Sequence, residues 1–85
     1  MNLENIKERL ELEGYTVFIS LDTLIGGEVS GRDEQLNFDL LGNTFSVEIK
    51  NNKITVDYAT AQVPKEKEFT SIEDAIQFIK EVRPL

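Results

Sequence analysis

The 85 residues are enough for one domain, and their composition excludes several classes of protein. Apolar residues make up 40% and charged residues 29% of the chain, which is ordinary globular usage and argues against disorder. Sixteen acids against nine bases give a net charge of −7, which disfavours direct binding to nucleic-acid phosphates and to anionic membranes.

A charged amphipathic helix is predicted over residues 3–13. Asn2 is suited to cap its N-terminus, and Gly14 stands where a left-handed residue commonly ends a helix. The segment lacks the apolar centre of a signal peptide, and no apolar run approaches the roughly 18 residues of a membrane span, so we expect a cytoplasmic protein. Its apolar face is formed at helical spacing by Leu3, Ile6 and Leu10.

A strand and a long connection are predicted next. Apolar and polar residues alternate through Tyr15–Asp22, which is the pattern of a half-buried strand. Residues 23–34 contain three glycines among scattered polar residues, so we expect an irregular connection there. A short extra strand around Glu28–Ser30 is the one regular element that we expect it could contain.

The middle of the chain predicts two hairpins. Gln35–Leu41 and Thr44–Lys50 are strand-like runs separated by Gly42-Asn43, a dipeptide suited to a two-residue turn. Asn51-Asn52 predicts a second turn, which leads into a strand over Lys53–Ala61. A shift of the pairing register by one residue in either hairpin would expose all the apolar side chains of a strand to solvent. The two turns together predict three apolar cross-strand rows: Leu40–Phe45–Tyr58, Phe38–Val47–Val56 and Leu36–Ile49–Ile54.

A solvated linker and a second helix are predicted after Pro64. The Lys-Glu-Lys-Glu run at residues 65–68 shows no apolar period, whereas Thr70 and Glu73 have the spacing of a capping box. Arg83-Pro84 ends the helix. Its apolar stripe consists of Ile72, Ala75, Ile76, Ile79 and Val82, with Phe78 at the edge.

The predicted fold is α+β, in one domain that covers residues 1–85. Only one face of the predicted sheet is continuously apolar, so both helices should pack there and leave the other face wet. We therefore expect two layers: a four-stranded antiparallel meander sheet with N- and C-terminal helices packed on one face, in the order α-β-β-β-β-α.

The residue types needed for common catalytic chemistry are missing from the chain. It has no histidine and no cysteine, which removes the usual general base near neutral pH, the nucleophilic triads and the commonest zinc ligands. The three glycines of residues 23–34 match neither common phosphate-binding pattern. We expect no enzymatic activity and no cofactor.

Three carboxylates are the candidates for a metal site: Asp39, Glu48 and Asp57. The predicted register places them in neighbouring rows on the wet face of the sheet, where grouped carboxylates can bind a divalent cation. A flat, solvated face offers no pocket, so no metal site is assigned. A cation-binding or small-ligand-binding domain is the alternative interpretation.

Apolar groups on the wet face indicate a contact site. Phe18 and Leu41 are predicted to project there, and large apolar groups on a polar surface can mark an interface. The candidate partner-binding residues are therefore Phe18, Asp39, Leu41 and Asp57.

These observations favour a small, acidic, non-catalytic module that binds another protein and regulates or inhibits it. The negative charge predicts a basic surface on that partner. A further alternative is an inhibitor that imitates nucleic-acid charge and binds a nuclease-type protein. The predicted edge strand Lys53–Ala61 has only two charged residues, Lys53 and Asp57, to hinder pairing with another chain. Both a monomer and a homodimer are therefore compatible with the sequence.

Overall fold

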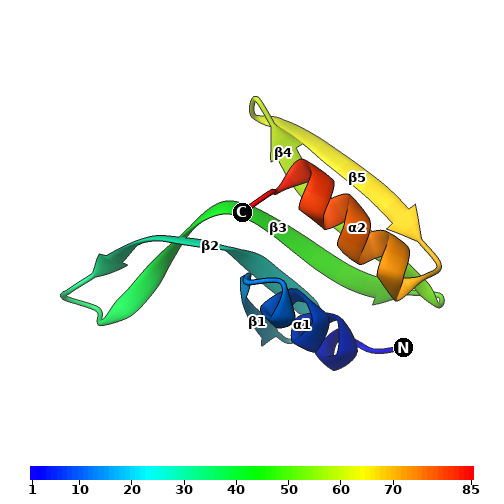
Figure 1. Ribbon diagram of the computed structural model, residues 1–85, viewed down its shortest axis with the longest axis horizontal. Helices are drawn as coiled ribbons and strands as arrows, with labels where there is room; N and C mark the ends of the chain where they lie inside the picture. The colour runs from blue at the N-terminus through cyan, green and yellow to red at the C-terminus, as the bar shows by residue number, and fades with distance from the viewer.

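Two helices cover one face of a five-stranded antiparallel sheet (Figure 1). The computed structural model describes all residues from Met1 to Leu85. Strand order follows chain order, so the sheet is a meander of consecutive hairpins. The predicted α+β, two-layer class is confirmed, with five strands in place of four. The elements are α1 (Leu3–Leu12), β1 (Thr16–Ser20), β2 (Thr23–Asp33), β3 (Phe38–Lys50), β4 (Lys53–Thr60), β5 (Val63–Phe69) and α2 (Ile72–Val82).

The helix ends follow from local hydrogen bonding. The side chain of Asn2 accepts a hydrogen bond from the N–H of Asn5 at 2.9 Å, and Gly14 has a φ of 103°, as predicted. At α2 the cap is Ser71, whose hydroxyl accepts from the N–H of Asp74 at 3.3 Å. The predicted capping box at Thr70 is therefore wrong by one residue, because Ser71 and Asp74 have suitable side chains at the same spacing. Neither helix is long and apolar enough to cross a membrane.

The core lies between the helices and the sheet. Val47 pairs with Val56 and Ile49 with Ile54, as the predicted Asn51-Asn52 turn requires. Both asparagines have a positive φ, which a two-residue primed turn needs. The core consists of twelve buried side chains: Ile6, Leu10, Tyr15, Val17, Leu24, Phe45, Val47, Ile54, Val56, Ala75, Ile76 and Ile79.

The glycine-rich segment forms a strand, so the prediction of an irregular connection was wrong. β2 is 11 residues long and pairs with both β1 and β3. A Cβ on Gly26 would lie 2.6 Å from the ring of Phe45, and one on Gly27 would lie 2.6 Å from the carbonyl oxygen of Gly42. These glycines permit close packing within the sheet, which is a different use of glycine from loop flexibility.

Gly42-Asn43 lies inside β3, so the predicted turn there was wrong. The chain turns earlier, at residues 34–37, where the Asp33 carboxylate accepts hydrogen bonds from the N–H groups of Gln35 and Leu36, both at 3.0 Å. Such a bonded aspartate favours a turn over a strand. Asn43 does have a positive φ of 49°, but it distorts the strand locally and does not reverse it.

Because the chain turns earlier than predicted, three apolar residues have neighbours that differ from the predicted ones. Phe38 lies opposite Asp33 and Leu40 opposite Gly31, so both pair with β2 at positions outside the core. Leu36 lies in the turn. The predicted rows through Leu36, Phe38 and Leu40 are therefore wrong, and all three side chains are exposed.

The Lys-Glu-Lys-Glu run forms most of β5, so the prediction of a solvated linker was wrong. β5 pairs with β4 along its whole length and covers the edge that was predicted to be open. Because side chains alternate, Lys65 and Lys67 share the face of Phe69, and the two glutamates lie on the opposite face. The ammonium group of Lys67 lies 5.0 Å from the ring centre of Phe78 on α2, a cation–π contact.

Arg83 fills the point where β3 and β4 separate. The pairing between these strands ends at Ser46 and Asp57. Beyond that pair the guanidinium donates hydrogen bonds to the carbonyl oxygens of Thr44, at 3.1 Å, and of Ala59. It also lies 5.6 Å from the centre of the Tyr58 ring. One side chain therefore replaces the missing backbone pairing between two strands.

The buried hydroxyl of Tyr15 makes the free energy of unfolding depend on pH in alkaline solution. Its hydroxyl donates to the carbonyl oxygen of Arg83 at 2.6 Å, and burial, followed by the charges of Glu13 and Glu28, raises the pKa of Tyr15 above 10.0. The unfolded chain therefore loses this proton first. The resulting stabilisation is complete below pH 10.0 and is lost as the pH rises through the folded-state pKa.

Urea unfolding between about pH 8 and pH 11 should show this fall in the free energy of unfolding. In Tyr15→Phe the fall should be shallower, since the shifted phenol is gone. Equal slopes in the two proteins would contradict the assignment to Tyr15.

Candidate functional site

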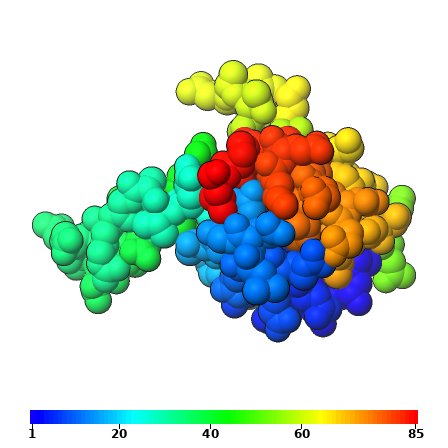
Figure 2. Space-filling view, viewed as in Figure 1, coloured from blue at the N-terminus to red at the C-terminus, as the bar shows by residue number.

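The hairpin of β2 and β3 extends beyond the two-layer body as an arm (Figures 1 and 2). β1 pairs with β2 only over Thr23–Gly27, and β4 pairs with β3 only over Ser46–Lys50. Residues 28–42, which we call the arm, are therefore a ribbon two strands wide. Figure 2 shows this ribbon, in cyan to green, standing clear of the rounded body.

Large apolar side chains are concentrated on the arm. Its members Val29, Leu36, Phe38 and Leu40 are 51%, 66%, 47% and 43% exposed. Leu41, opposite Val29, is half-buried. An isolated two-stranded ribbon is only marginally stable in water, and neither helix covers this one. The arm therefore presents an apolar surface that the fold itself leaves open.

The polar groups of the arm leave it with an excess of negative charge. Four acids and one base give residues 28–42 a net charge of −3. Arg32 pairs with Asp39 across the ribbon at 2.9 Å, so the only base is already neutralised. The remaining carboxylates, on Glu28, Asp33 and Glu34, form no ion pair. The exposed apolar groups are thus accompanied by unpaired acids.

The outer face of the sheet, opposite the helices, carries a second candidate surface. One row of side chains crosses all five strands: Phe18, Ile25, Ser46, Asp57 and Glu66. The row is apolar on β1 and β2 and acidic on β4 and β5. An open depression of 350 Å³ lies beside its middle, with Ile25, Ser46 and Asp57 among its lining residues. No strongly polar group is buried in it.

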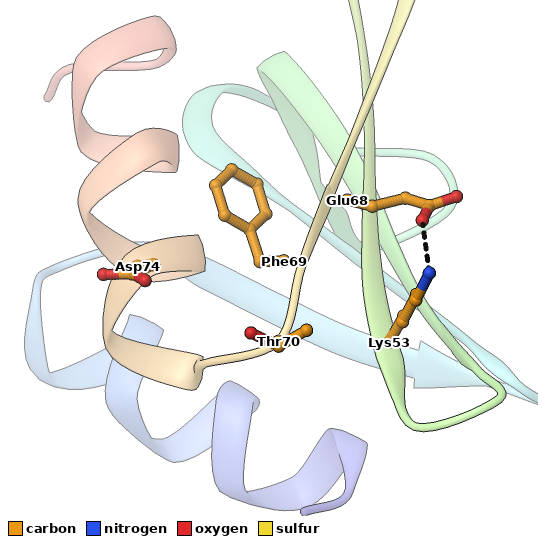
Figure 3. Close-up of a pocket in the computed structure, with 5 residues that line it drawn as sticks. All are labelled: Lys53, Glu68, Phe69, Thr70 and Asp74. Carbon is orange, nitrogen blue, oxygen red and sulfur yellow. Dashed lines mark ion pairs between the residues drawn. The ribbon is translucent and has the colours of Figure 1, made fainter.

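A hollow of 310 Å³ lies between the β4–β5 hairpin and the start of α2 (Figure 3). The Phe69 ring is directed toward α2, and Asp74 lies on the helix away from the strands. Lys53 and Glu68 form an ion pair at 3.7 Å on the strands. These polar groups do not converge on one point, so the hollow has no arrangement suited to catalysis.

The predicted metal candidates are not brought together. Asp39 lies on the arm beside Arg32, whereas Glu48 lies opposite Thr55 and Asp57 lies opposite Glu66. No group of three or more carboxylates could hold a metal ion. The predicted register holds for Asp57 and Glu48, which lie opposite Ser46 and Thr55. Asp39 does not join them, because β3 is one continuous strand in which Asp39 pairs with Arg32 of β2.

The four predicted partner-binding residues divide between the two surfaces. Phe18 and Asp57 lie in the same row of the outer face, whereas Asp39 and Leu41 lie on the arm. Sequence reasoning missed the other apolar residues of the arm, because it assigned Leu36, Phe38 and Leu40 to the core. The hydrogen-bonding capacity of Asp33 was the signal for the true turn.

No protein-family model, no curated protein and no solved structure matches this chain.

Proposed function

We propose that the protein is a non-catalytic protein-interaction module that contacts its partner through the arm. The observation that supports this proposal is the group of exposed apolar side chains on a ribbon that neither helix covers. Burying a large apolar side chain completely contributes about 1.5–3 kcal/mol. Three half-exposed side chains, Leu36, Phe38 and Leu40, therefore offer enough apolar area for the centre of an interface.

The unpaired acids of the arm support a partner with a basic surface. Charged groups around an apolar contact add specificity and speed association. The acids with no ion pair lie at the base of the arm, on Glu28, and near its turn, on Asp33 and Glu34. A chain without cysteine gains nothing from an oxidising compartment, and we place the interaction in the cytoplasm.

Two phenylalanines provide a matched test of the surface. Phe38 on the arm and Phe18 on the outer face are both 47% exposed. We expect Phe38→Ser to weaken partner binding at least about tenfold, as loss of a central apolar contact does, whereas Phe18→Ser leaves binding unchanged. The measurement is capture of the partner from lysate of the native cell on immobilised protein, followed by titration of the captured protein.

Thermal unfolding serves as the control, because both variants should keep the native fold. The opposite result, in which only Phe18→Ser loses binding, would assign the interface to the outer face. Capture of no protein by the unaltered chain would argue against an interaction module.

A further inference from the structure

The arm exposes a backbone edge along β3. This strand pairs with β2 from Phe38 onward, but its pairing with β4 begins only at Ser46. The carbonyl of Thr44 is occupied by Arg83. Between Phe38 and Asn43, the side of β3 that faces away from β2 therefore has no neighbouring strand.

This edge is less protected than the other free edges of the sheet, which lie on β1, on β5 and on β2 beyond Gly27, where Glu28, Arg32 and Asp33 are charged. Natural edge strands are usually guarded by charges, by proline or by being short. β5 has Pro64 followed by four charged residues, and β1 is only five residues long. The segment Phe38–Asn43 has no proline, and its one charged residue, Asp39, is paired with Arg32.

The geometry points to strand addition: we propose that an extended, cationic segment of the partner pairs with β3 between Phe38 and Asn43. This inference rests on the proposed function of the arm. Backbone hydrogen bonds would supply affinity, and alternate side chains of the added strand would supply specificity. Because Phe38 and Leu40 lie on one face of the ribbon, every second residue of the segment should be apolar.

Charge decides between a foreign segment and a second copy of this chain. Pairing two arms would bring together two ribbons that each carry a net charge of −3, from chains that each carry −7. A segment that alternates apolar residues with lysine or arginine faces the opposite balance, since the acids Glu28, Asp33 and Glu34 are unpaired. Opposite charge therefore favours a cationic segment.

The test uses a short capped peptide of alternating lysine and valine as the probe. Titration into the isotope-labelled protein, followed by amide NMR shifts, should give shifts concentrated at residues 38–43. The same peptide with an N-methyl group on every residue has no backbone N–H donor on either edge, so its binding should be at least about tenfold weaker. A peptide of alternating glutamate and valine should not bind. Phe38→Ser should weaken binding of the lysine peptide, whereas Phe18→Ser should not.

Equal binding of the methylated and unmodified peptides would overturn strand addition, because contact would then depend on side chains alone. Shifts centred on β1 or β5 would overturn the assignment to β3, and a dimer of the chain alone in sedimentation would assign the edge to a second copy. If no peptide shifts residues 38–43 while Phe38→Ser still abolishes partner capture, strand addition is wrong and the proposed function stands. If Phe38→Ser leaves capture intact, the proposed function fails independently.

Discussion

Replacement of Gly26 by alanine is expected to destabilise the protein by about 2 kcal/mol, within the usual range for an overpacked core. The added Cβ would lie 2.6 Å from the Cζ atom of Phe45, a ring that is 3% exposed and cannot move into solvent. Phe45 is also held at its edge by Tyr15, with ring centres 5.5 Å apart. The free energy of unfolding, measured in urea by circular dichroism, checks this expectation.

Gly31 provides the control for this substitution. A Cβ there would meet only the Cδ1 atom of Leu40, at the ordinary contact distance of 3.8 Å. We expect Gly31→Ala to change stability by no more than about 0.5 kcal/mol, because it removes freedom from the unfolded chain without a clash. In a double-mutant cycle, Phe45→Leu should cost less in the Gly26→Ala background than in the unaltered chain. Equal effects of the two alanine substitutions would contradict the packing role of Gly26.

Replacement of Arg83 by alanine is expected to cost about 2 kcal/mol, since hydrogen bonds to a charged donor each contribute about 1.5–3 kcal/mol and these are partly exposed to water. The change removes the donor shared by the Thr44 and Ala59 carbonyls and the contact with the Tyr58 ring. For a domain of this size, the midpoint of thermal unfolding should fall by about 10 °C.

Two further variants separate the role of the guanidinium from that of its charge. Arg83→Lys keeps the charge but cannot reach two carbonyls in the planar geometry of arginine, so it should recover little stability. Lys80→Ala removes a surface ion pair with Glu13, the C-cap residue of α1, and should cost less than about 0.5 kcal/mol. An Arg83→Ala midpoint equal to that of Lys80→Ala would show that the two strands do not need the bridge.

The parts of the fold that the sequence predicts well depend on agreement between turn chemistry and side-chain alternation. Asn51-Asn52 is a good primed turn, and it places Val47 opposite Val56 as the apolar pattern demands. The cap at Asn2 and the helix end at Gly14 involve only neighbouring residues. Each of these features is local, so a single sequence is sufficient to predict it.

The failures have two physical causes. Asn43 adopts the positive φ that its type favours, but the same conformation serves a distorted strand as well as a turn. β5 was missed because Ala61 and Gln62 form its turn with positive φ angles that their types rarely adopt, and because it is polar on both faces. The inward face can be polar because the ammonium group of Lys67 lies over the rings of Phe69 and Phe78, where a hydrophobic residue would ordinarily pack.

The candidate site was predicted only in part, for a related reason. Phe18 and Asp57 share a row because the registers that place them lie in regular parts of the sheet. The apolar alternation of Phe38 and Leu40 is the same in a core strand and in an exposed contact surface. Only the position of the preceding turn distinguishes the two cases, and that turn depends on the hydrogen bonds that the Asp33 carboxylate accepts from the N–H groups of Gln35 and Leu36.

The meander order also determines when the core can close during synthesis on the ribosome. Each hairpin joins neighbours along the chain, so the sheet can assemble strand by strand as it emerges. The links between the N-terminal region and the region of α2 span far more of the chain: Arg9 of α1 with Glu73, and Tyr15 with the carbonyl of Arg83. Until α2 has left the exit tunnel, the core lacks the three buried side chains that this helix contributes, Ala75, Ile76 and Ile79. Until that helix docks, the nascent chain therefore exposes the apolar face of the sheet, which chaperones and other unfolded chains can bind.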